Sequence, residues 1–126
     1  FLDDRELRLA FHDNYGENNS LIKQLARRVS LPGGISVTRG HLGVTTYDVK
    51  TRSFFEAPVL SQKIVDTTGA GDAFLALTAP CVAKGFPMDL VAFIGNAAGA
   101  LAVGFLGNKS SIETTQLFKF ITALLK

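Results

Sequence analysis

Apolar and polar positions follow two different periods in the first half of the chain. Residues 3–11 and 20–29 place apolar side chains at helical spacing, and Asn19 and Ser20 are suited to cap the second helix. Three short runs rich in β-branched and aromatic residues follow at 35–38, 44–49 and 53–57. Because only short turns separate these runs, we expect a β-hairpin or meander.

The second half of the chain is strongly apolar and reads as helical. The pattern predicts helices at about 72–84, 88–105 and 113–125, and a turn at Gly85-Phe86-Pro87 separates the first two. Pro80 falls inside the first of these helices and is expected to kink it. Helices, strands and turns therefore alternate as they do in a layered α/β domain.

One uncharged run raises the question of a membrane span. Residues 90–108 carry no charged side chain, and their length is marginal for crossing a bilayer. The run also contains Asn96, Asn108 and several glycines, which fits a buried helix better. Gly95 and Gly99 would let two backbones approach closely, so we expect no membrane partner.

Composition narrows the function classes. The 126 residues are 47% apolar and 19% charged, which is typical of a globular domain. The 13 basic and 11 acidic residues give a net charge of +2, so there is no electrostatic argument for a nucleic-acid partner. The single cysteine, Cys81, excludes an internal disulfide and fits a reducing, cytoplasmic location.

The most informative segment is the nonapeptide from Asp66 to Phe74, which runs from a polar turn into an apolar helix. Gly69 and Gly71 can take backbone angles closed to other residues, and they leave no side chain in the way of an incoming group. Unpaired N–H groups and the positive end of the helix dipole at such a turn form a seat for phosphate. A carboxylate, Asp72, stands in that seat. It would repel a phosphate that is only bound, but it could take a proton from a hydroxyl that attacks the phosphate.

The local pattern also allows a simpler interpretation, in which Asp72 is a helix N-cap and the glycines form an ordinary turn. The whole string, however, resembles the D-T-x-G-A-G-D-x-F signature of the ribokinase/PfkB family of carbohydrate kinases at every specified position. The resemblance implies an α/β fold, namely the C-terminal part of a ribokinase-like three-layer α/β/α architecture with a mostly parallel sheet.

The resemblance also implies roles for individual residues. Asp72 would be the catalytic base, and the N–H groups of Gly69, Ala70 and Gly71 would form the anion hole. The turn after the first predicted strand resembles the family's T-x-G-x-x-G element, which lies by the nucleotide phosphates, through Thr38, Gly40 and Gly43. The local pattern alone favours a plain hairpin turn here, and the neighbouring nonapeptide at about the right separation favours the nucleotide interpretation.

Cation and base contacts follow from the same resemblance. Glu6 matches the family's N-x-x-E element and would help to hold Mg²⁺, although an acidic first turn of a helix explains it equally well. Asn96 lies where relatives face the adenine, and its partner could be nucleotide or backbone. A potassium-like cation site is implied at Asp66, Thr68, Ala102, Phe105, Gly107 and Ser111.

The resemblance covers only the C-terminal portion of such kinases. Residues 1–126 would be the nucleotide-binding part, with ATP and a sugar or sugar phosphate as partners. A missing N-terminal half would supply the sugar pocket, a lid and most of the sheet, so the isolated chain is expected to be inactive and to self-associate. The stretches GNAAGALAV and GNKSSI are most similar to the heptose-phosphate kinase branch.

Two alternatives remain at this point. A module that binds nucleotide without turnover, or that regulates a kinase, would keep the same phosphate seat. A dinucleotide-binding Rossmann domain fits less well, because Phe74 stands where its third glycine would be expected and the preceding β-run at 63–65 is short.

Overall fold

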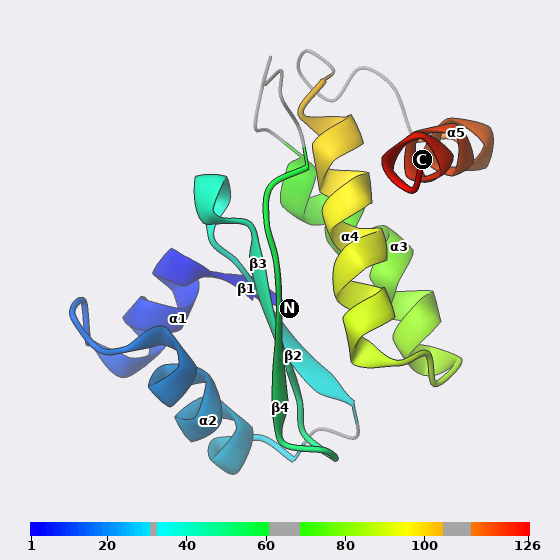
Figure 1. The fold of residues 1–126 in the computed structure, drawn as a ribbon. Coiled ribbons are helices and arrows are strands. Elements are labelled where there is room, and N and C mark those ends of the chain that lie inside the picture. Colours follow the sequence, from blue (N-terminus) through cyan, green and yellow to red (C-terminus); the bar gives the residue numbers. More distant parts are fainter. Residues whose placement is uncertain (31–32, 61–68, 105–111) are drawn as a thin grey trace.

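A four-stranded sheet lies between two pairs of helices in the computed structural model, which describes residues 1–30, 33–60, 69–104 and 112–126 (Figure 1). The elements are β1 (Leu2–Asp3), α1 (Asp4–Phe11), α2 (Asn18–Arg28), β2 (Gly34–Thr38), a short 3₁₀ turn η1 (Gly40–Leu42), β3 (Val44–Asp48), β4 (Ser53–Ala57), α3 (Ala70–Ala83), α4 (Met88–Ala102) and α5 (Thr114–Leu124). Helices α1 and α2 cover one face of the sheet, α3 and α4 lie on the other side, and α5 packs beside α4. The layered α/β architecture is as predicted.

The sheet has the order β1-β2-β3-β4 and mixes two kinds of pairing. Strands β2, β3 and β4 form the expected antiparallel meander, with Thr38 opposite Val44 and Val44 opposite Ala57. Strand β1 pairs with β2 in parallel, with Asp3 opposite Thr38. Among the described strands, β1 and β2 are thus the parallel part of the expected sheet.

Alternation along β2 assigns its side chains to the two layers. Ile35 and Val37 join the core beneath α1 and α2, together with Leu7, Leu21, Ile22 and Tyr47. Ser36 points to the opposite face, where its hydroxyl lies 3.1 Å from that of Thr46. The two buried hydroxyls satisfy one another between the sheet and the second pair of helices.

One aromatic side chain packs helices α3 and α4 together and against the sheet. Phe74 of α3 is buried to 2% exposure and packs with Val44 of β3 and Ala92 of α4. A Cβ atom on Gly95 would lie 2.6 Å from Cζ of the Phe74 ring, so this ring occupies the space that Gly95 leaves open. Gly95 thus makes room for an aromatic ring rather than for the second backbone that was predicted, whereas a Cβ on Gly99 would make an ordinary 3.7 Å contact with the Ala70 carbonyl.

Several boundaries differ from the predicted ones for local reasons. Strand β1 was not predicted, since two residues are too few to show a period. Helix α2 begins earlier than expected because the Glu17 carboxylate, rather than Asn19 or Ser20, caps it by accepting two backbone N–H groups. Helix α3 begins at Ala70 and continues past Pro80.

In the described parts of the chain, no helix combines the length and the apolarity that crossing a bilayer requires.

The contrast between the two α4 glycines gives a stability test. We expect Gly95→Ala to lower the free energy of unfolding by about 1–3 kcal/mol, because the buried Phe74 ring has little room to move away from a new methyl group. Gly99→Ala, one turn further along the same helix, should be neutral or raise stability by about 0.5–1 kcal/mol through helix propensity. Thermal unfolding of both variants measures the difference, and equal effects would contradict the packing described.

Candidate active site

The first turn of α3 carries the predicted anion seat. Gly69 is the N-cap in a left-handed conformation with φ 81°, and the first helical hydrogen bond runs from the Ala73 N–H to the Gly69 carbonyl at 2.9 Å. The N–H groups of Ala70, Gly71 and Asp72 therefore have no acceptor within the helix. They point out of its positive end, which favours an anion.

Asp72 is the third residue of α3, and its side chain is exposed. The simpler interpretation of Asp72 as the N-cap is wrong, because Gly69 occupies the cap and supplies no side chain. The left-handed backbone that this position requires is one that glycine adopts without strain, which explains the residue. Asp72 is thus left with its carboxylate in solvent beside the unpaired N–H groups.

Of the two reasons that the sequence gives for Gly71, a special backbone angle and the absence of a side chain, the structure does not support the first. Gly71 lies inside the helix and is not among the glycines with positive φ, so a glycine-only backbone angle is not what requires it. Among the described residues, a Cβ there would contact the Phe1 ring at an ordinary 3.6 Å. This side of Gly71 therefore faces an aromatic ring, with room for a methyl group between the ring and the backbone.

Phe1 is a neighbour of this turn that sequence reasoning missed. Its ring stacks on Phe74 with centroids 5.1 Å apart and an interplanar angle of 26°. It also lies against Gly71. Nothing in the local sequence signals a contact between residues so far apart in the chain.

The turn after β2 forms a second part of the site. Its backbone is closed on itself by hydrogen bonds from the Arg39 N–H to the Gly43 carbonyl at 2.8 Å and from the Gly43 N–H to the Gly40 carbonyl at 3.1 Å. Gly40 and Gly43 both take positive φ, of 56° and 86°. The turn does connect a hairpin, as the simpler interpretation had it, and a Cβ on Gly40 would meet none of the described residues within 4 Å.

The charged side chain in this turn is already engaged. Arg39 donates from Nη1 to the Thr45 hydroxyl at 3.3 Å and lies 3.8 Å from the Glu56 carboxylate. Both partners belong to neighbouring strands of the sheet, where Thr45 pairs with Glu56. His41, in contrast, is exposed in the turn.

Asn96 has found a backbone partner. Its Nδ2 donates a hydrogen bond to the carbonyl of Pro58, the residue that follows β4. Of the two partners that the sequence left open, nucleotide or backbone, the structure provides the backbone. Asn96 thereby ties α4 to the end of β4.

Glu6 takes part in a helix cap. Asp3 accepts the Glu6 N–H at 2.8 Å while Glu6 Oε2 accepts the Asp3 N–H at 2.7 Å, which is a capping box. The simpler interpretation of this acidic turn is confirmed, and it leaves the second Glu6 oxygen outside the cap. In the described ranges, no three His, Cys, Asp or Glu side chains come together as a metal-binding group.

Of the residues predicted for the potassium-like site, Ala102 is buried at the end of α4. The others lie outside the described residues: Asp66, Thr68, Phe105, Gly107 and Ser111.

The fold gathers these parts at one edge of the sheet. Figure 1 shows η1, the end of β4 and the start of α3 together at the top of the molecule. Gly43 confirms part of this arrangement, because a Cβ on it would lie 3.0 Å from Cα of Pro58. Segments from three separate parts of the sequence thus meet at the edge where the predicted phosphate-binding turns lie.

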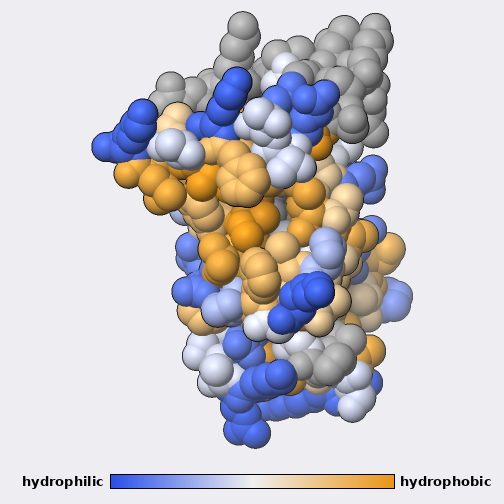
Figure 2. Space-filling view, turned by 90° about the vertical axis from the view of Figure 1, so that its right-hand side faces the viewer, coloured by the Kyte–Doolittle hydropathy of each residue, from blue (hydrophilic) through white to orange (hydrophobic). Residues whose placement is uncertain are grey.

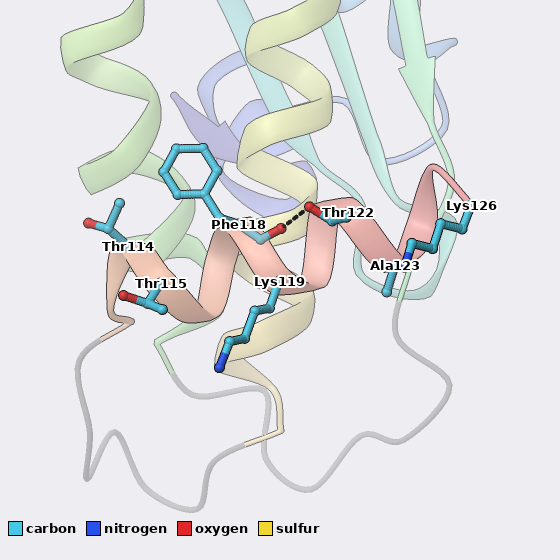
Figure 3. Close-up of a pocket in the computed structure, with 7 residues that line it drawn as sticks. All are labelled: Thr114, Thr115, Phe118, Lys119, Thr122, Ala123 and Lys126. Carbon is cyan, nitrogen blue, oxygen red and sulfur yellow. Dashed lines mark hydrogen bonds between the residues drawn. The ribbon is translucent and has the colours of Figure 1, made fainter.

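A hollow of about 660 Å³ lies elsewhere, along α5 (Figure 3). It is lined by Thr114, Thr115, Phe118, Lys119, Thr122, Ala123 and Lys126. All of these come from one helix and its end, and none carries a carboxylate that could act as a base. The predicted site residues do not line this hollow, so it is not the candidate active site.

Comparison with known proteins supports the motif-based expectation. Residues 1–115 match the model of the pfkB family carbohydrate kinases. The bifunctional protein HldE of Vibrio vulnificus (strain YJ016) is 35% identical over 89 residues. That match covers 71% of this chain but only 18% of the relative, so the chain corresponds to a small part of that protein's length.

Solved structures show the same fold. Ribokinase from Thermotoga maritima superposes with a TM-score of 0.78 at 25% identity, over 95% of this chain and 40% of its own. Phosphofructokinase-2 from Escherichia coli in complex with potassium superposes with a TM-score of 0.82 at 17% identity, over 99% of this chain and 41% of its own. Arabidopsis thaliana ribokinase complexed with ribose and ATP superposes with a TM-score of 0.78 at 21% identity, over 94% of this chain and 39% of its own. The chain therefore belongs to the pfkB family of carbohydrate kinases and has a ribokinase-like fold.

Proposed function

We propose that this chain is the nucleotide-binding, base-carrying portion of an ATP-dependent kinase that phosphorylates a hydroxyl of a sugar or sugar phosphate. The observation that carries the proposal is the first turn of α3, where the exposed Asp72 carboxylate stands beside the open N–H groups of Ala70 and Gly71. A site for binding alone gains nothing from a negative charge next to phosphate. A transfer site gains a proton acceptor.

The chemistry assigns one task to each group. Asp72 accepts the proton of the sugar hydroxyl as that oxygen attacks the γ-phosphorus of ATP, and the bond to the leaving ADP oxygen breaks. The N–H groups at the start of α3 stabilise the charge on the phosphoryl oxygens in flight. Fixed donors of this kind are worth about 3 kcal/mol each in other enzymes, because they need no reorganisation.

The cofactors follow from the same chemistry. ATP would supply the phosphoryl group, as the complex of Arabidopsis ribokinase with ribose and ATP suggests for a related fold. Mg²⁺ prefers oxygen ligands and retained waters, and the Glu6 oxygen left outside the capping box could take part. A potassium-like ion, present in the E. coli phosphofructokinase-2 complex, would here involve the backbone carbonyl of Ala102.

The relatives narrow the choice of the molecule that accepts the phosphoryl group. HldE proteins match about two thirds or more of this chain at 33–36% identity, in agreement with the heptose-phosphate kinase branch suggested by the sequence. We therefore favour a sugar phosphate over a free sugar. A cytoplasmic site of action would suit both ATP use and the free thiol of Cys81.

Among the described residues, nothing covers one side of the helix that carries Asp72. The exposed side of α3 begins with Asp72 and continues with Leu75, Ala76, Ala79 and Ala83. Figure 2 shows apolar side chains gathered on the side of the molecule where α3, α4 and α5 lie in Figure 1. A helix that is apolar on all sides belongs in the interior of a larger protein. We infer that the remainder of a complete kinase domain covers this face and supplies the sugar pocket, and that self-association would replace it in the isolated chain.

Substitution of the base provides the primary test. In the complete kinase, Asp72→Asn should lower turnover by about 10²–10⁴-fold, because the amide has nearly the same shape but cannot accept the proton. ATP affinity, measured by calorimetry on the same sample, should change little. Turnover within threefold of wild type would remove Asp72 from its assigned role, and a wild type that binds ATP without phosphorylating any sugar would favour a non-catalytic nucleotide module.

Gly71 tests the anion seat separately from the base. Gly71→Ala should leave thermal stability unchanged or slightly raised, because among the described residues the added methyl group meets the Phe1 ring at an ordinary 3.6 Å. Since Cβ atoms of a helix tilt toward its N-terminus, the methyl group should crowd a ligand at the N–H donors, and we expect a loss of about 10- to 100-fold in kcat/KM. Gly99→Ala is the matched helical control and should keep full activity. Equal activity of the two variants would show that this turn is only a connector.

A further inference from the structure

Helix α4 is joined to the sheet by a polar contact in an otherwise apolar interface. The side of α4 that contains its buried residues is built from small and aliphatic side chains, among them Val91, Ala92 and Ala98. Asn96 is a polar residue on this mainly apolar helix. Its amide donates a hydrogen bond to the carbonyl of Pro58, 38 positions earlier in the chain. Because β4 ends at Ala57, the Pro58 carbonyl lies beyond the strand pairing of the described sheet, and the Asn96 amide provides it with a partner.

The segment that Asn96 holds is itself in contact with the turn after β2. Gly43 ends that turn with φ 86°, and its backbone lies directly against Ala57 and Pro58. A Cβ on Gly43 would collide with the Ala57 carbonyl and lie 3.0 Å from two atoms of Pro58. A shift of Pro58 would therefore be transmitted to the turn, since no side chain or void separates the two backbones.

Helix α4 also contacts the start of α3, where the anion seat lies. The residue before Asn96 is Gly95, which holds the ring of Phe74, and Gly99 lies one turn later against the Ala70 carbonyl. Helix α4 thus touches the first turn of α3 through two glycines and touches the end of β4 through Asn96. The distance between the two phosphate-binding turns is set by this one helix.

We propose that Asn96 is a positioning residue for nucleotide binding: by holding Pro58 against Gly43, it fixes the turn at Gly40–Gly43 relative to the anion seat of α3. The inference rests on the proposed function, because it assumes that both turns bind the nucleotide phosphates. Asn96 then acts through Pro58 on the phosphates and makes no selection of the base.

The test compares ligands that share phosphates but differ in the base. In the complete kinase, Asn96→Asp keeps the shape of the side chain, removes the donor and places a carboxylate against the Pro58 carbonyl. Asn96→Ser shortens the side chain without adding charge, and it serves as the second variant if the first fails to fold. Asn14→Asp, at an exposed position in the α1–α2 loop, is the matched control for the same chemical change.

Dissociation constants are measured for ATP, GTP and inorganic tripolyphosphate, alongside the melting temperature. We expect both Asn96 variants to raise the dissociation constants of all three ligands by a similar factor of about five to ten. This is the loss of affinity expected for one hydrogen bond of ordinary net strength. Asn14→Asp should leave all three constants unchanged.

Other outcomes separate the alternatives. Weaker binding of ATP with unchanged tripolyphosphate binding would mean that Asn96 contacts the base, and would overturn the inference. A lower melting temperature with unchanged constants would make Asn96 purely structural, and would also overturn it. A wild type that binds none of the three ligands would instead overturn the proposed function.

Discussion

The site depends on the packing of the Phe74 ring against Gly95. Phe74 belongs to the same nonapeptide as Asp72, so the burial of this one ring fixes the first turn of α3 on α4, and α4 lies over β3 and β4. Phosphoryl transfer relies on positioning and preorganised donors rather than on reactive side chains. The geometry at the start of α3 can therefore be no more rigid than the aromatic contact beneath it, and Phe1 adds to that contact by stacking on the same ring.

Much of the fold could be predicted because the signals are local. The hairpin strands carry β-branched and aromatic residues between short turns, and each apolar helix has a run long enough to show its type. Strand β1 could not be found this way, because its two residues are strand only by pairing with β2. The cap of α2 was assigned to Asn19 and Ser20 instead of Glu17, since several polar residues there are able to cap and only the chain's path selects one.

The candidate site shows the same division between local and long-range information. The nonapeptide predicted the anion seat and Asp72 through glycines followed by a helix, and its resemblance to the family signature was needed to favour this over a plain capped turn. The backbone-angle reason given for Gly71 was wrong, since a sequence does not reveal whether a glycine serves a backbone angle or the absence of a side chain. The partners of Phe1 and Asn96 lie 73 and 38 positions away, and no local pattern encodes such contacts.

The central claim is that α3 presents a base and an anion seat to the same phosphoryl group. The most direct measurement is a crystal structure of the complete kinase with ADP, its sugar acceptor and aluminium fluoride in place of the phosphoryl group. The account predicts fluoride at about 2.7–3.1 Å from the N–H groups of Ala70 and Gly71, and the acceptor hydroxyl at about 2.6–3.2 Å from the Asp72 carboxylate. A fluoride bound away from the first turn of α3, or an acceptor hydroxyl out of reach of Asp72, would contradict it.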